Sequence, residues 1–383
     1  MGSNGNRFKV ITYNYDLISG KVNQVSYQLG VPGQAGNADA FYHQYRYDAE
    51  NRLVNVRTSR DSVLWQNDAS YSYYRHGPLA RMQLGDLQVQ GVDYAYTLQG
   101  WLKSINPSSV NIGGDLYDAD GTGSSPLFER DAYKLNLNYY DDGTYTDYLP
   151  INAPSGYVQG NALPVASKYN LYNGNIGSMA LSLRPLASST AMIYNYRYDQ
   201  LNRINSMDAW AANGSFAPTG STPMQDYQER YSYDPNGNIM TLLRNGTTAN
   251  SGNLAMDNLT YLYKYVQTGG GIGEYTPGQA PTTGVDHLTN QLSSIRDAVA
   301  SSNYPADIDN QAALNYTYDA IGNLTGDAQA GITNIVWSVY GKILSITKNG
   351  STTTYTYDAA GNRITKTTGE LPLHMYEMHR VMY

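Results

Sequence analysis

The chain has 383 residues, contains no cysteine and carries a formal net charge of -7. The absence of cysteine excludes disulfides and thiol catalysis, and an acidic balance without any basic run argues against nucleic acid as a partner. Tyrosine numbers 38, against 4 phenylalanines and 4 tryptophans, while charged residues make up only 15%. Because tyrosine is a strand former with a polar hydroxyl, this composition favours β-structure with many turns.

One short pattern recurs along the chain and reads Tyr-x-Tyr-Asp followed by Gly or Asn. The two tyrosines of each copy share one face of an extended strand. The aspartate can accept a backbone hydrogen bond in a turn, and Gly or Asn tolerates the positive φ that a tight turn needs. Each copy therefore predicts a strand, a turn and a return strand. Full copies begin at Tyr45, Tyr196, Tyr231, Tyr316 and Tyr355.

The polar residues that recur in these copies are interpreted as turn formers rather than catalytic groups. Each aspartate stands where a turn must be capped, which is sufficient reason for its presence. The residues predicted to form these repeat turns are Asp48, Asn51, Asp199, Asn202, Asp234, Gly237, Asn238, Asp319, Gly322, Asn323, Asp358, Gly361 and Asn362.

The remaining chain is interpreted as worn copies of the same unit, interrupted by loops. Worn copies are predicted at residues 11–22, from Tyr71, from Tyr94 and at residues 336–346. Stretches rich in Gly and Pro predict surface loop insertions at about 106–135, 205–226 and 266–284. Residues 286–300 have a weak helical pattern, for which strand and turn are preferred. Residues 1–383 are thus predicted to form a single array of β-hairpins.

The motif Tyr-x-Tyr-Asp-x-x-Gly-Asn resembles the YD repeat of RHS proteins, and the resemblance covers nearly the whole chain. Secondary phrases at residues 76–81, 93–103 and 337–343 resemble the branch found in Bacteroidota-type bacteria. The resemblance implies an all-β ribbon of YD-repeat hairpins that spirals into a hollow, cocoon-like shell. The C-terminal self-cleavage and toxin regions of many family members are not found, and neither is the hairpin that usually follows Thr368. Two explanations stay open, that the chain has lost this hairpin or that the sequence is a fragment, so the shell is expected to be complete only if further residues close it.

The function implied by the resemblance is that of a structural, non-enzymatic shell. It would be secreted by a gram-negative bacterium or displayed on its surface, and would enclose or present a polypeptide cargo such as a toxin or effector. Its partners would be that protein cargo, or a carrier or secretion machinery of the type IX kind. The alternative is a surface adhesion or glycan-binding module, in which exposed Tyr and Trp rings stack on sugars. No apolar run approaches 18 residues, so no transmembrane segment is expected.

A calcium-binding loop is the one metal site that the sequence suggests. Residues 118–129 have the ligand spacing of such a loop, but position five is Thr, position nine is Pro, and no flanking helices are evident. A solvated polar loop is therefore the alternative, and no other cofactor is expected. The calcium ligands would be Asp118, Asp120, Thr122, Ser124 and Glu129.

Other chemical motifs are not matched. His374, Glu377 and His379 do not have the spacing of helical zinc motifs, which place two histidines one turn apart. No Gly-x-Ser-x-Gly elbow is present, and the glycine run at 269–273 lacks the Lys-Ser/Thr of a phosphate-binding loop. The sequence therefore predicts no enzyme.

Overall fold

The structure is a computed structural model in which every regular element of the described residues is a β-strand. The prediction of an all-β fold is therefore confirmed. No helix capable of spanning a membrane occurs in the part of the chain that the structure describes. The described residues are 10–27, 40–87, 89–106, 133–140, 170–183, 191–212, 218–249, 253–276, 278–279, 281, 283–369 and 371–374.

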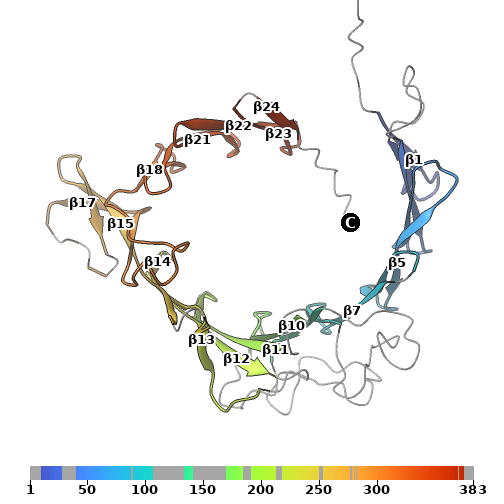
Figure 1. Cartoon of the computed structure of the whole chain (residues 1–383), viewed down its shortest axis with the longest axis horizontal. Coiled ribbons are helices and arrows are strands. Elements are labelled where there is room, and N and C mark those ends of the chain that lie inside the picture. The colour runs from blue at the N-terminus through green and yellow to red at the C-terminus, as the bar shows by residue number, and fades with distance from the viewer. Residues whose placement is uncertain are drawn as a thin grey trace, which may run out of the picture. The chain divides into compact units, whose positions relative to one another are not determined.

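The chain divides into two compact units, one formed by Met1–Arg197 with Ala209–Met224 and the other by Tyr198–Asp208 with Gln225–Tyr383. In the first unit each strand pairs antiparallel with the next one along the chain (Figure 1). The strands are β1 (Ile11–Tyr15), β2 (Val22–Tyr27), β3 (Phe41–Tyr47), β4 (Leu53–Ser59), β5 (Gln66–Tyr73), β6 (Leu79–Leu84), β7 (Gln90–Tyr96), β8 (Leu102–Ile105), β9 (Tyr133–Asn138), β10 (Ser178–Leu183) and β11 (Ala191–Tyr198).

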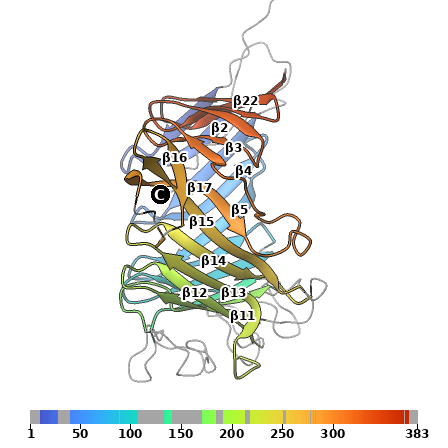
Figure 2. The ribbon, with the colours of Figure 1, turned by 90° about the vertical axis from the view of Figure 1, so that its left-hand side faces the viewer.

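The second unit contains two groups of antiparallel strands. In the first group β13, β14 and β15 lie side by side (Figure 2), and β15 also pairs with β16 and β17. A seven-stranded sheet, β18 to β24, forms the second group. The strands are β13 (Met224–Tyr233), β14 (Ile239–Asn245), β15 (Ala255–Gln267), β16 (Ile272–Tyr275), β17 (Val285–Asp297), β18 (Tyr316–Tyr318), β19 (Leu324–Asp327), β20 (Ile332–Trp337), β21 (Ile343–Lys348), β22 (Ser351–Tyr357), β23 (Arg363–Thr368) and β24 (Leu371–His374).

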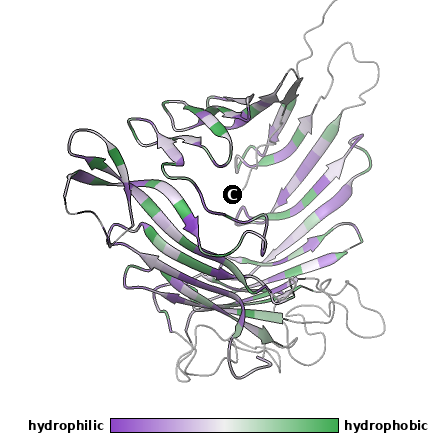
Figure 3. Ribbon diagram, turned by 60° about the vertical axis from the view of Figure 1, so that its left-hand side comes forward, coloured by the Kyte–Doolittle hydropathy of each residue, from purple (hydrophilic) through white to green (hydrophobic). Residues whose placement is uncertain are grey.

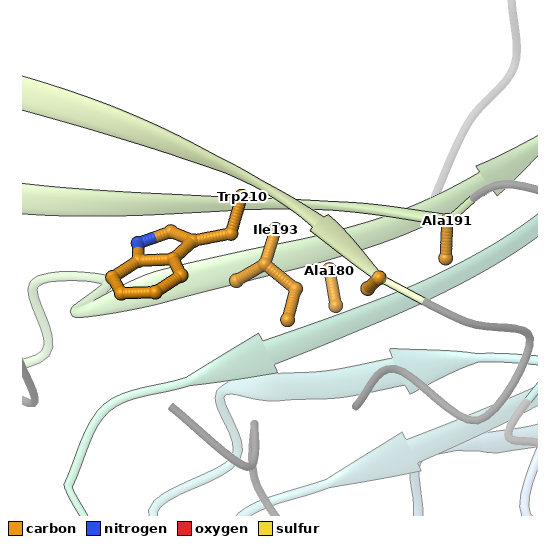
Figure 4. Packing of buried hydrophobic residues seen from close by; sticks show 5 residues of the cluster. Ala180, Ala191, Ile193 and Trp210 are labelled. Carbon is orange, nitrogen blue, oxygen red and sulfur yellow. The ribbon is translucent and has the colours of Figure 1, made fainter. Parts of the chain in front are cut away.

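The predicted loop at about 205–226 is wrong in its first part, because β12 (Ile204–Ala212) is a strand with residues in both units. Within the first unit, Trp210 is only 2% exposed and packs in a buried cluster with Ala180, Ala191, Ile193 and Ala212 (Figure 4). Burying an indole against these small side chains stabilises a strand that the adjacent turn residues Asn213, Gly214 and Pro218 made look like a loop. The end of the predicted loop, from Met224, belongs to β13, and residues 213–217 lie outside the described residues.

The predicted loop at 266–284 is also partly wrong, because it contains β16. Gly269 and Gly270 have φ of 103° and 89°, and Gln267 and Gly271 close a tight turn with a backbone hydrogen bond of 2.7 Å. The glycines therefore turn β15 into β16, where Tyr275 is buried. Of the predicted loop at 106–135, residues 107–132 lie outside the described residues, and its end enters β9.

The preference for strand at residues 286–300 is confirmed by β17, which has 13 residues. Polar and apolar residues are interspersed along the strands (Figure 3). On one face of β21, β22 and β23, threonine hydroxyls pair across the strands, as in Thr356 with Thr365 and Thr347 with Thr352. These cross-strand pairs stabilise a sheet without a hydrophobic residue at every second position.

Candidate functional site

The repeat turn is the element that recurs most faithfully. In its last copy, the Asp358 backbone N–H donates to the Asn362 carbonyl oxygen at 2.9 Å, and the Gly361 N–H donates to the Asp358 carbonyl oxygen at 3.0 Å. One carboxylate oxygen of Asp358 accepts from the N–H groups of Ala360 and Asn362, and the other accepts from the Asn362 side chain at 3.0 Å. The aspartate thus satisfies the polar groups of a three-residue hairpin loop with a left-handed third residue.

The other full copies use this geometry in two versions. Around Asp234 and Asp319, as around Asp358, the third residue after the aspartate is glycine, with φ of 92° at Gly237 and 96° at Gly322. The next residue, Asn238 or Asn323, donates to both carboxylate oxygens.

In the second version, Asn51 and Asn202 occupy the left-handed position, each with φ of 61°. They replace the glycine of the repeat, whereas Arg52 and Arg203 replace its asparagine. Arg52 Nε donates to Asp48 at 2.7 Å, and Arg203 Nε donates to Asp199 at 2.6 Å. The repeat pattern grouped these asparagines with those of the other copies and did not predict this exchange. Their offset from the aspartate distinguishes them, since Asn51 and Asn202 follow it by three residues and the other asparagines by four.

Hydrogen bonds to the carboxylate of Asp199 favour its ionised form. The backbone N–H of Arg203 lowers the pKa of Asp199, and the Arg203 side chain lowers it further, against an opposing effect of burial. Because the folded-state pKa is depressed, the stability that this turn supplies is present at neutral pH and is lost as the pH falls through that pKa.

A second recurring contact, which we call the tyrosine latch, ties paired strands together. The last residue of one strand donates its side-chain hydrogen to the backbone carbonyl of the first residue of the preceding strand. Tyr357, at the end of β22, donates to Ile343 O of β21 at 2.8 Å, beyond the last paired residues Ser345 and Thr354. Similar bonds of 2.7–3.0 Å join Tyr47 to Val22, Tyr73 to Leu53, Tyr233 to Ile204 and Trp337 to Leu324. Tyr263, which lies inside β15 and not at its end, donates to Ile239 O in the same way at 2.8 Å.

The latch and the turn fasten opposite sides of the same strand. The turn at Asp358 joins β22 to β23, while the latch from Tyr357 closes the open end between β22 and β21. Trp337 takes the place of the tyrosine in a worn repeat, and only Tyr and Trp combine a large ring with a hydrogen-bond donor. The sequence placed these aromatic residues in strands, but it did not indicate their acceptors.

The latch predicts different effects for the two tyrosines of one repeat. We expect Tyr357→Phe to lower the free energy of unfolding by about 1 kcal/mol, since the Ile343 carbonyl oxygen loses the hydrogen bond from the Tyr357 hydroxyl. Tyr355→Phe is the matched control, because no hydrogen bond is described for the Tyr355 hydroxyl. Urea unfolding of the two variants measures the difference, and equal stabilities would contradict the latch.

A cleft of about 680 Å³ lies beside the turn between β4 and β5. Asp61 orders this turn by accepting hydrogen bonds from the N–H groups of Val63 and Leu64 at 2.9 and 2.8 Å. Trp65 Nε1 donates to Ser62 O at 3.2 Å, which holds the ring. The cleft combines aromatic and polar side chains; its lining is Phe41, Thr58, Ser59, Arg60, Asp61, Leu64, Trp65 and Gln66.

The metal ligands suggested by the sequence are not brought together by anything that the structure describes. Asp118, Asp120, Thr122, Ser124 and Glu129 lie outside the described residues, so the calcium loop stays a prediction. His374 ends β24, while Glu377 and His379 lie outside the described residues.

The hairpins, turns and latches together define an all-β repeat protein. Residues 337–370 match the RHS repeat family model. These residues therefore carry a repeat of the RHS/YD-repeat type, which confirms the predicted resemblance for this segment. The matched segment runs from the latch residue Trp337 through β21, β22 and the Asp358 turn to β23.

No curated protein matches the chain in sequence. Among solved structures, the chain is similar to a chain in the crystal structure of TcdB2-TccC3-Cdc42, with 14% sequence identity and a TM-score of 0.24. The similarity covers 94% of this chain and 19% of the other, so this chain spans about a fifth of the length of that one.

Proposed function

We propose that this chain is a segment of an RHS-type structural shell that encloses or presents a polypeptide. The observation that supports the proposal is the repetition of turn and latch in successive hairpins. An array of this kind distributes its stability over nearest-neighbour contacts, so it can be extended over a large area without one central core. Such a ribbon is suited to surrounding another chain.

The tyrosine faces supply a suitable contact surface for a polypeptide. Tyr231 and Tyr233 stack with ring centroids 6.5 Å apart, and both rings remain half-buried rather than covered. The Tyr231 hydroxyl donates to Glu229 and the Tyr233 hydroxyl donates to Ile204 O, so both hydroxyls already have a partner within the chain. Burial of aromatic surface of this kind contributes to binding without requiring one sequence in the partner.

The test is an intact-mass and gel analysis of the protein purified under native conditions from its own producer. We expect a co-purifying polypeptide, or a longer parent chain, that resists protease until the array is unfolded by denaturant. A lone chain of 42.2 kDa that protects nothing would contradict the proposal.

The proposal includes export from a gram-negative bacterium, by a type IX-like route, to the cell surface or the medium. The support is the resemblance of the secondary sequence phrases to the Bacteroidota-type branch. Cell fractionation would place the protein in the outer-membrane or medium fraction, and recovery from the cytosol alone would contradict this part.

The second candidate function is glycan binding, which the cleft beside Trp65 favours. Aromatic rings stack on sugar faces, and the neighbouring Arg60, Asp61 and Gln66 can exchange hydrogen bonds with hydroxyl groups. In this case a polysaccharide would quench tryptophan fluorescence, and Trp65→Ala would abolish the quenching while Trp337→Phe would not. If the chain is a shell that does not bind glycans, the polysaccharide will quench the tryptophan fluorescence of neither the wild type nor the variants.

A further inference from the structure

Three aspartates meet in the second unit at a place that no sequence motif marks. Asp257 lies in β15, Asp297 ends β17, and Asp307 lies in the segment 298–315 between β17 and β18. One carboxylate oxygen of each residue lies within 4.8 Å of the others. Asp257 is 1% exposed and Asp297 is 6% exposed, so the cluster is largely removed from water.

The hydrogen-bond donors around the cluster satisfy some of its carboxylate oxygens but not all of them. Arg244 Nε donates to Asp257 Oδ2 at 2.6 Å, while Asp257 Oδ1 is buried and has no hydrogen-bond partner. Asp307 Oδ1 is likewise buried without a partner. Asp297 Oδ1 accepts from the N–H groups of Asn258 and Val299 at 2.9 and 3.0 Å. Two enclosed carboxylate oxygens that face no donor indicate that a positively charged group is required there.

The charge balance leads to the same requirement. Three ionised carboxylates and one guanidinium leave two negative charges in a mostly buried place. The cluster must therefore gain either a cation or a proton.

The segment that carries Asp307 is anchored on both sides of it, so its carboxylate is held at the cluster. On one side, the Tyr304 hydroxyl donates to Asn253 O at 2.9 Å and accepts from the Thr247 N–H at 3.1 Å. A Cβ at Gly246 would overlap this hydroxyl. On the other side, Gln311 exchanges hydrogen bonds with the backbone of Ile295, with its N–H donating to Ile295 O at 3.0 Å. The segment thereby also covers an edge of β17.

We propose that Asp257, Asp297 and Asp307 bind a divalent cation, with Ca²⁺ as the best fit. A hard cation takes carboxylate oxygens as ligands, and oxygens bound to one Ca²⁺ at about 2.4 Å lie no more than about 4.8 Å apart. Arg244 occupies Asp257 Oδ2 and leaves Oδ1 to the ion. The bound ion would neutralise the cluster and fix the segment that connects β17 to the seven-stranded sheet. This inference does not depend on the proposed shell function.

The experiment is a Ca²⁺ titration of the whole chain after treatment with EDTA, followed by calorimetry and by thermal unfolding. We expect Ca²⁺ to bind and to raise Tm, and Asp307→Asn to weaken the binding by about tenfold or more and to remove the rise in Tm. Asp307→Asn keeps the shape of the side chain and removes a repelling charge, so without Ca²⁺ it should be at least as stable as the wild type.

Two control variants make the result specific. Asp286→Asn, whose carboxylate is 64% exposed on β17, should retain the full response. A double variant, Asp118→Asn with Asp120→Asn, removes any Ca²⁺ binding by the loop that the sequence suggested, and should still show the rise in Tm that depends on Asp307. Ca²⁺ binding that is unchanged in Asp307→Asn would overturn the proposal. So would a wild type that ignores Ca²⁺ and is stabilised by mild acid, since Asp307 would then be protonated instead.

Discussion

Replacing Arg81 with methionine is expected to lower the free energy of unfolding of the first unit by about 3–5 kcal/mol. Arg81 Nη1 lies 2.6 Å from Asp93 Oδ2, and the two side chains are only 4% and 1% exposed. The pair joins β6 to β7, where Arg81 and Asp93 are opposite each other in the register. Removal of the guanidinium takes away the charge that lies 2.6 Å from the buried Asp93 carboxylate, which is far more costly than loss of an exposed ion pair.

Denaturant unfolding measures the effect, and two further variants establish its cause. Arg75→Met removes an exposed arginine from the adjacent turn and should change stability little. Adding Asp93→Leu to Arg81→Met should recover much of the loss, because an apolar pair can replace a buried ion pair at nearly constant stability. If Arg81→Met and Arg75→Met unfold at the same denaturant concentration, the buried pair does not stabilise this unit.

The second large effect is expected from Gly361→Val, with a loss of about 1–3 kcal/mol. Gly361 has φ of 83° and donates its N–H to the Asp358 carbonyl oxygen. A β-branched residue is strained in this left-handed conformation. There is room for a Cβ, since its nearest contact would be the Lys342 side chain at 3.5 Å. The loss would therefore come from the backbone conformation and not from a clash.

Ala360→Val is the matched control, because Ala360 is exposed in the same turn and is not among the residues with positive φ. Thermal unfolding should show a clear decrease in Tm for Gly361→Val and little change for Ala360→Val. A Gly361→Val protein that melts like the wild type would show that this hairpin turn is not held in the left-handed conformation.

The sequence alone predicted the strand–turn–strand units, because their determinants are local. Asp358 bonds to groups two and four residues further along the chain, and the φ that Gly361 must adopt belongs to a single residue. The type of residue and its offset are therefore enough to predict such a turn. The same local reasoning was wrong at β12 and β16. Glycine and proline lie next to these strands in the sequence, and the strands were therefore predicted to be parts of loops.

Only the tertiary structure decided how the hairpins are joined and where the buried charges lie. The latch from Tyr47 reaches Val22, which is 25 residues away, and the pair of Arg81 with Asp93 depends on the register of β6 and β7. The cluster of Asp257, Asp297 and Asp307 depends on the pairing of β15 with β17 and on the return of the following segment. These contacts join residues far apart in the chain, and a local pattern carries no information about which distant carbonyl or carboxylate the fold will bring to it.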